Sequence, residues 1–208
     1  MANTKERIVD TAVELFNQSG TAAVSTNHIA SAMGISPGNL YYHFGNKDEI
    51  VAAAFDRLER ALDAVWEGGT HGDLAAVDPI VMKTMSVLRE YRFIARELFA
   101  LGVHSPRLRD RSRAVLERFV QRMRSIVDAC VAEGMLRDPG GMEACRRLAE
   151  ALAIALISYV PEVELRDPTV DSARIIEGVE RVALLLVPYQ TEPVSWRPGY
   201  YHGAIAHA

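Results

Sequence analysis

Apolar residues recur along this chain at intervals of three and four, which is the spacing of amphipathic helices. No stretch alternates apolar and polar residues in the way that a half-buried strand would. The longest regular stripe lies between about Pro106 and Glu133, where we expect one long helix. The chain is therefore predicted to be all-α. The residues of that stripe are Leu116, Phe119, Val120, Met123, Ile126, Val127, Cys130 and Val131.

Start and stop signals divide the N-terminal third of the chain into four helices. Asn3 and Glu6 form a capping-box pattern, and Gly20 stands where a C-terminal stop belongs. Asn46 and Glu49 give a similar start signal further along. The expected helices run from Asn3 to about Gly20, from about Thr26 to Met33, from about Pro37 to Phe44 and from Asn46 to about Trp66.

The rest of the chain is also predicted to be helical. Gly68 and Gly69 indicate a joint, and the loop from Asp138 to Gly141 separates two later helices. The segment from Pro188 onward is predicted to be irregular. The expected helices cover about Pro79–Arg89, Phe93–Leu101, Pro106–Glu133, Met142–Val160 and Val170–Val187.

Composition and charge limit the classes of function. Hydrophobic residues make up 49% of the chain and charged residues 24%, as in ordinary globular proteins. The N-terminus carries charge where a signal peptide needs an apolar core, and the most apolar stretch, Ala151 to Val160, is too short to span a bilayer. We therefore expect a soluble, cytoplasmic protein with no membrane partner. The net charge is −4, and the first fifty residues lack the basic footprint that is typical of DNA-binding domains.

The segment from Ser25 to Lys47 fits the template of a helix-turn-helix. Two helices of about eight residues are joined by a turn in which Gly34 can adopt a positive φ angle. Apolar side chains from both helices would hold the pair together. These residues are Ile29, Ala30, Met33, Leu40 and Phe44.

The second helix of this pair offers polar groups suited to DNA. Ser36 can cap it and Pro37 can occupy its first position, so that its free N–H groups face a phosphate or a base edge. Asn39 can form paired hydrogen bonds with adenine, and tyrosine hydroxyls and Lys47 suit phosphates. We expect one of the two adjacent tyrosines to pack inward. The exposed set is Gly38, Asn39, Tyr41, Tyr42 and His43.

The string GISPGNLYYHFGNKDEI resembles the recognition helix and following linker of the TetR family of transcriptional repressors. The resemblance covers about the first sixty residues. It implies an all-α fold in which a three-helix DNA-binding domain precedes a larger helical domain for effector binding and dimerisation. The implied parts are a reading head (residues 1–46, with the motif at about 25–44), a connecting helix (47–67), the larger domain (68–187) and an irregular tail (188–208).

The resemblance also implies a role for each matching residue. Phosphate contacts are expected from Thr26, Tyr42 and Lys47. Contacts to bases are expected from Asn27, Pro37, Gly38 and Asn39, with Tyr41 and His43 at the groove wall. Two positions depart from the family. Asn27 stands where some members carry a long basic residue, and Gly45 replaces a frequent lysine or arginine.

The resemblance predicts a repressor that binds a near-palindromic operator as a homodimer and is released by a small-molecule effector. The dimer would form through helices at about 142–160 and 170–187, where alternate residues from Ala149 to Ala155 are alanine. An effector would shift the helix from Asn46 to Trp66 and so change the spacing of the two recognition helices. Two alternatives remain: a helical small-molecule-binding protein or enzyme that does not bind DNA, and a regulator or activator without an effector.

Other side chains receive weaker interpretations. Apolar residues that would line an effector pocket, or simply form core, are Trp66, Met82, Met85, Phe93, Phe99, Phe119 and Met123. The long helix carries arginines that form a solvated face or attract an acidic effector, namely Arg107, Arg109, Arg111, Arg113, Arg118, Arg122 and Arg124. Cys130 and Cys145 are expected to be core residues. No metal, cofactor or catalytic site is expected.

Overall fold

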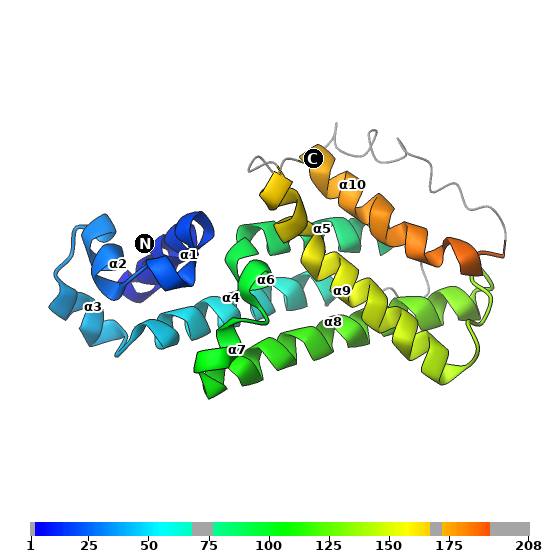
Figure 1. Ribbon diagram of the computed structural model, residues 1–208, viewed down its shortest axis with the longest axis horizontal. Helices are drawn as coiled ribbons and strands as arrows, with labels where there is room; N and C mark the ends of the chain where they lie inside the picture. The colour runs from blue at the N-terminus through cyan, green and yellow to red at the C-terminus, as the bar shows by residue number, and fades with distance from the viewer. Residues whose placement is uncertain (1–2, 68–76, 167–171, 192–208) are drawn as a thin grey trace. The chain divides into compact units, whose positions relative to one another are not determined.

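The structure is a computed structural model, and it describes residues 3–67, 77–166 and 172–191. Nearly all of these residues are helical, in the order α1 to α10 followed by the 3-10 helix η2 (Figure 1). Within the described ranges, the sole extended pairing is a single bridge between Leu136 and Gln190. The prediction of an all-α fold is confirmed.

Local capping signals place the four N-terminal helices where the sequence predicts them. The Asn3 side chain accepts a hydrogen bond from the Lys5 N–H at 3.0 Å, and the Asn3 N–H donates to Glu6 at 3.2 Å. The Asn46 side chain accepts from the Glu49 N–H at 3.0 Å. The helices are α1 (Thr4–Ala23), α2 (Thr26–Met33), α3 (Pro37–His43) and α4 (Lys47–Trp66).

Two glycines with positive φ angles shape the reading head. Gly20 has a φ of 77° and breaks the regular path of α1, so that Thr21 begins a separate short turn. Gly34 has a φ of 66° and ends α2, where its N–H donates to the carbonyls of Ala30 and Ser31. Both positions favour glycine because other residues seldom adopt this conformation.

A small apolar core holds α1, α2 and α3 together, as the sequence pattern predicts. Ile8 and Phe16 of α1, Ile29 of α2 and Leu40 of α3 are completely excluded from solvent, and Phe44 is 3% exposed. Burial of side chains of this size is the main source of stability in a domain of three short helices.

The later helices follow the prediction with three corrections. The last α-helix, expected to reach Val187, ends at Ala183 and is followed by a 3-10 helix. The expected single helix from Phe93 to Leu101 is wrong, because α6 ends at Glu97 and the separate α7 follows three turn residues later. The expected end near Val160 is also wrong, because α9 continues through Pro161 and buries Val163. The helices are α5 (Val77–Glu90), α6 (Arg92–Glu97), α7 (Leu101–His104), α8 (Pro106–Ala132), α9 (Met142–Arg166), α10 (Ser172–Ala183) and η2 (Leu184–Tyr189).

The start of the predicted tail is more ordered than expected. Pro188 and Tyr189 belong to η2, and the Thr191 N–H donates to the Met135 carbonyl at 3.0 Å. The glycine pair at 68–69, the start of the predicted last helix at Val170 and residues 192–208 lie outside the described ranges.

The described chain forms two compact units. Unit 1 contains the chain up to Asp63 together with Glu90–Val115, and unit 2 contains Ala64–Arg89 and the chain from Leu116. Unit 1 therefore joins the reading head to α6, α7 and the start of α8. The contacts responsible link residues 73 to 80 positions apart, which a pattern of local periodicity does not reveal.

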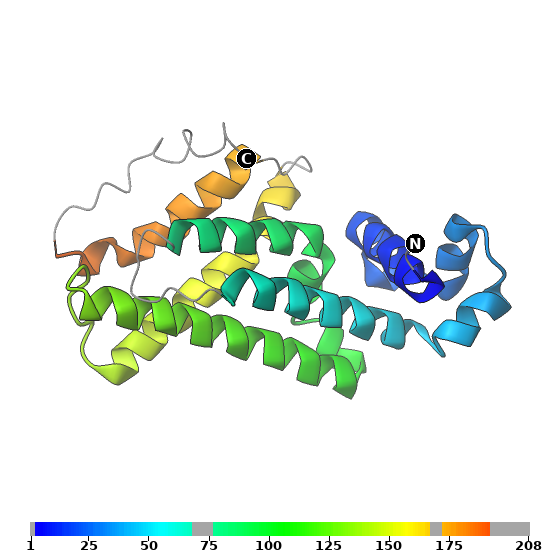
Figure 2. The same cartoon turned by 180° about the vertical axis from the view of Figure 1, so that it is seen from behind.

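In unit 2, α9 and α10 lie side by side, as both views show (Figures 1 and 2). Gly178 of α10 lies directly against the ring of Tyr159, and the Tyr159 hydroxyl donates to the Arg174 carbonyl at 2.8 Å. Burial raises the pKa of Tyr159 to about 12, with Glu177 adding to the effect. The phenol therefore stays protonated and keeps this hydrogen bond at any physiological pH.

Candidate nucleic-acid interface

The N-terminal turn of α3 is exposed and carries the cap that the sequence predicts. The Ser36 hydroxyl accepts from the Asn39 N–H at 3.2 Å, and Pro37 occupies the first helical position. Residues 36–39 are all exposed. Because the N-terminal N–H groups of a helix point outward along its axis, this turn can meet an anion or a base edge.

The two faces of α3 differ sharply in character. Leu40 is completely buried, whereas Asn39 is exposed, Tyr41 is 50% exposed and Tyr42 is 84% exposed. The prediction that one of the two tyrosines packs inward is therefore wrong. Both rings remain on the surface, whereas Leu40 and Phe44 are buried.

Hydrogen bonds and ring contacts orient several of the predicted contact residues. The Tyr41 hydroxyl lies 3.1 Å from the Thr26 Oγ1, which links α3 to α2. The rings of Tyr42 and His43 meet edge to face, with centroids 5.1 Å apart. His43 is half-buried and Asn27 is exposed. Sequence reasoning missed the Thr26–Tyr41 bond because it joins residues on two different helices.

Lys47 is held more firmly than a surface phosphate contact would require. Its Nζ donates to the carbonyls of Thr21 at 2.6 Å and Val24 at 3.1 Å, so the start of α4 is fixed to the end of α1. An ammonium group has three N–H donors, and these two carbonyls use two of them. Sequence reasoning had assigned Lys47 to a phosphate alone.

Glycines 38 and 45 have different surroundings. A Cβ at Gly38 would meet nothing closer than the Ser36 hydroxyl at 3.9 Å, so the protein itself does not require glycine there. A Cβ at Gly45 would lie 3.2 Å from the Glu49 carboxylate, which accepts from the Gly45 N–H at 2.8 Å. The fold therefore places no steric requirement for glycine at position 38.

The predicted pocket residues divide between the two units. Phe93 belongs to unit 1, where it is completely buried with its ring centroid 5.1 Å from that of Phe16, and Phe99 is 68% exposed. Phe93 therefore belongs to the core beside Phe16, and Phe99 lies on the surface. The remaining residues lie in unit 2, where they are buried or half-buried: Trp66, Met82, Met85, Phe119 and Met123.

One polar contact accompanies these apolar residues. The Trp66 Nε1 donates to the Thr84 hydroxyl at 3.0 Å, and Thr84 is completely buried. Arg122 lies over the Trp66 ring, 5.5 Å from its centroid. Nothing in the sequence singled out Thr84, because a threonine on a helix is usually either exposed or packed in the core without a specific polar contact.

The arginines of α8 that have described partners act structurally. Arg111 forms ion pairs with Asp56 and Glu59 of α4, and Arg124 pairs with Asp128 at 2.7 Å. Arg109 donates to the Gly102 carbonyl at 3.1 Å. These contacts favour a structural role for the three arginines over recruitment of an acidic effector.

The cysteines are buried and free, as predicted. Burial raises the pKa of Cys130 to about 11 and also raises the pKa of Cys145. In the part of the chain that the structure describes, no group of histidine, cysteine, aspartate or glutamate residues is arranged to hold a metal. In the same ranges, no helix combines the length and the apolar character that crossing a bilayer requires.

Comparisons with known proteins agree with this geometry. The family described as bacterial regulatory proteins, tetR family, matches residues 8–54, and the TetR family of bacterial transcriptional repressors matches residues 56–195. The HTH-type transcriptional regulator UidR of Escherichia coli K12 is 32% identical over 128 residues, which are 58% of this chain. The match spans 65% of the length of UidR, slightly less than two thirds.

Solved structures share the fold along nearly the whole chain. A TetR-family transcriptional regulator from Marinobacter aquaeolei VT8 superposes with a TM-score of 0.79 at 26% identity, covering 99% of this chain and 97% of that one. SmeT, solved as a complex with triclosan, has a TM-score of 0.66 at 18% identity, covering 94% of this chain and 95% of that one. On its two family matches and its exposed helix-turn-helix, this chain belongs to the TetR family of DNA-binding transcriptional regulators.

Proposed function

We propose that this regulator is a repressor that binds a near-palindromic operator as a homodimer and leaves it when a small apolar effector binds. The observation that carries the proposal is the exposed, polar face of α3 above a fully buried Leu40. This face pairs an exposed helix N-terminus with Asn39 and two exposed tyrosines, which are groups that meet phosphates and base edges.

Base contacts are assigned to Asn27, Pro37, Gly38 and Asn39, and phosphate contacts to Thr26, Tyr42 and Lys47, with Tyr41 and His43 at the groove wall. Ser36 caps the helix that carries them. The open space at Gly38 supports its assignment, because a backbone without a side chain allows close approach of the groove. The exposed positions of Asn27, Asn39 and Tyr42 support theirs.

The direct test is selection of binding sites from random duplex DNA with the purified protein, followed by gel shift of the Asn39→Ala variant. A bidentate contact to a base contributes about 1–3 kcal/mol of discrimination, so the variant should lose roughly tenfold or more in its preference for the selected duplex. Gln18→Ala removes an exposed side-chain amide from α1 and is the matched control. Failure to select any duplex, or an unchanged preference in Asn39→Ala, would contradict the proposal.

A homodimer through α9 and α10 is supported by an uncharged exposed face. Ala151, Ile154, Ala155 and Ser158 follow one another at helical spacing on α9 and are exposed or half-buried, and Ile154 is 49% exposed. Small residues beside one larger apolar residue allow close approach of a second helix. Further exposed apolar side chains lie in η2, at Leu184, Leu185 and Val187.

The effector is assigned to unit 2, near Trp66 and the buried residues Met85, Phe119 and Met123. This environment is apolar, with the Thr84 hydroxyl as a buried polar group. The solved complex of SmeT with triclosan supports a ligand in this fold. A screen of small apolar molecules for release of the wild-type protein from its selected duplex tests the assignment.

A further inference from the structure

Helix α6 begins without a cap of its own, and α1 supplies one. Tyr91, the residue before α6, makes no side-chain capping hydrogen bond. Instead the Asn17 side chain accepts from the Phe93 N–H at 3.0 Å and donates to the Glu90 carbonyl at 2.8 Å. Asn17 is only 8% exposed, so this amide is committed to the start of α6. An asparagine on α1 thus satisfies an orphan donor of a helix that lies 76 positions away.

Helix α6 returns a cap to the end of α1. Gly20 breaks α1, so the carbonyls of Phe16 and Asn17 lie in its last regular turn. The Arg96 guanidinium donates to them at 2.8 Å and 3.3 Å. A cation at the carboxyl end of a helix is also favoured by the helix dipole. The two helices therefore cap each other.

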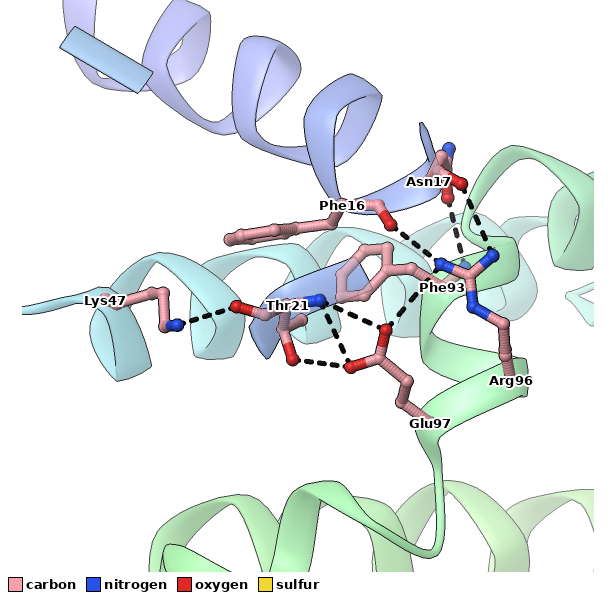
Figure 3. Close-up of polar contacts among 7 residues, drawn as sticks. All are labelled: Phe16, Asn17, Thr21, Lys47, Phe93, Arg96 and Glu97. Carbon is pink, nitrogen blue, oxygen red and sulfur yellow. Dashed lines mark hydrogen bonds and ion pairs between the residues drawn. The ribbon is translucent and has the colours of Figure 1, made fainter. Parts of the chain in front are cut away.

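Thr21 completes the connection after the break in α1. The Glu97 carboxylate accepts from the Thr21 N–H at 3.1 Å and from the Thr21 hydroxyl (Figure 3). The Thr21 carbonyl accepts from Lys47 at 2.6 Å, so the same residue touches α6 and α4. Beside these polar groups, the tilted rings of Phe16 and Phe93 are in contact and completely buried (Figure 3).

We propose that Asn17, Thr21, Arg96 and Glu97, which we name the α1–α6 latch, fix the orientation of the reading head on α6 and thereby set the half-site spacing that the dimer accepts. This inference rests on the proposed function, because it requires both a dimer and a DNA target. A dimer reads two half-sites together only when both recognition helices are correctly separated. Each head is fixed to α6, α7 and the start of α8 within unit 1. A head that could turn on α6 would accept a wider range of separations, so the latch narrows the range that the dimer accepts.

The latch consists of directional hydrogen bonds, and this favours a positioning role over simple adhesion. An apolar contact such as Phe16–Phe93 tolerates small rotations, whereas bonds to particular N–H and carbonyl groups do not. Without the latch the head would sample several orientations. The apparent affinity for a correctly spaced duplex would then fall in proportion to the fraction of correctly oriented molecules.

The test uses the full-length protein and the duplex selected by the wild type, together with versions that carry one or two base pairs inserted at its centre. Glu97→Leu removes both acceptors of Thr21, and Thr21→Val removes only the hydroxyl. Glu97→Gln keeps one acceptor oxygen. The matched control is Glu117→Leu, which makes the same change at an exposed position of α8. Dissociation constants are measured by fluorescence anisotropy and corrected for the active fraction.

Glu97→Leu should bind the selected duplex about tenfold more weakly, as expected if roughly one molecule in ten is correctly oriented, and should lose most of its preference against the inserted spacings. Thr21→Val should lose part of that preference, and Glu97→Gln and Glu117→Leu should stay close to the wild type. A purely structural role would lower the melting temperature or the active fraction and leave the ratio between spacings unchanged.

An unchanged spacing ratio in Glu97→Leu and Thr21→Val would overturn the proposal, even with a lower melting temperature. If Glu97→Leu does not fold, Thr21→Val decides the question alone, because it leaves the backbone contacts of the latch in place. If the wild type selects no duplex at all, the proposed function fails first, and the latch loses its role with it. The failures of the two proposals are therefore distinguishable.

Discussion

Lys47 has a role in the fold in addition to the phosphate contact that we propose for it. Its ammonium group anchors the start of α4 to two carbonyls at the end of α1, and one N–H remains beyond those two bonds for a phosphate. Its side chain is half-buried. The two roles predict two separate effects of losing the charge.

The variant Lys47→Met keeps most of the aliphatic stem and removes the ammonium. Loss of the donor from two partly buried carbonyls should lower the free energy of unfolding by about 1–3 kcal/mol, measured by urea denaturation. If the third N–H contacts a phosphate, the slope of log affinity against log salt should fall by about 1. A lower stability with an unchanged slope would remove Lys47 from the phosphate contacts.

Cys130 is predicted to be inert in the folded protein. At pH 8 a thiol with a pKa of about 11 is ionised in roughly one molecule in a thousand, and only the thiolate reacts readily. In a Cys145→Ser background, Cys130 should therefore remain unalkylated by iodoacetamide at pH 8, as followed by mass spectrometry. The same protein in guanidinium chloride should react at once. Rapid alkylation of the folded form would contradict the buried position.

At the scale of elements, helices meet through a few positions where side chains leave no spare room. Gly178 is one, because a Cβ there would overlap the Tyr159 ring and lie 2.9 Å from the Met85 Cε. The ring is held in place by the bond from its hydroxyl to the Arg174 carbonyl. The α9–α10 contact therefore depends on a residue with low helix propensity.

Gly178→Ala should reverse the usual sign of a glycine-to-alanine change. In an open helical position the substitution stabilises by about 1 kcal/mol, whereas overpacking against a fixed ring costs about 1–3 kcal/mol. We expect a net decrease of the melting temperature. Gly38→Ala, whose Cβ meets no atom closer than 3.9 Å, is the control for stability and should not lower it. Equal effects of the two substitutions would argue against the tight α9–α10 contact.

At the scale of the whole molecule, the proposed dimer rests on the exposed face of α9. Ile154→Glu places a charge in the middle of that face and should yield a monomer in analytical ultracentrifugation. Because two linked heads gain from binding together, the monomer should bind the selected duplex about 10² times more weakly or worse. Val103→Glu makes the same change at an exposed position of α7 and should leave the dimer intact. If the Ile154→Glu variant remains a dimer, the dimer interface does not lie on this face of α9.

The alanines of α9 show why the sequence pattern only partly predicted this face. Every second residue from Ala149 to Ala155 is alanine, and this pattern indicated a close helix contact. However, a period of two residues does not match the period of a helix. Ala149 and Ala153 are buried inside the subunit, whereas Ala151 is exposed and Ala155 half-buried. The uncharged outer face combines the latter two with Ile154 and Ser158.

The sequence by itself determined the helices, their caps and the exposed chemistry of α3. Asn3, Gly20, Ser36 and Asn46 act on groups within four residues, so their effects are set before the chain is compact. For the same reason the helix-turn-helix and the resemblance it carries could be identified from a short string of letters.

Only the tertiary structure decided what the side chains between the elements do. In the sequence, nothing distinguishes Asn17, Arg96 and Glu97 from other helix residues. In the structure they join two helices through contacts between residues 73 to 80 positions apart. Phe93 enters the core beside Phe16, and the Lys47 ammonium reaches two carbonyls at the end of α1. Such contacts depend on which surfaces the folded chain brings together, and the spacing of residues along the sequence does not reveal this.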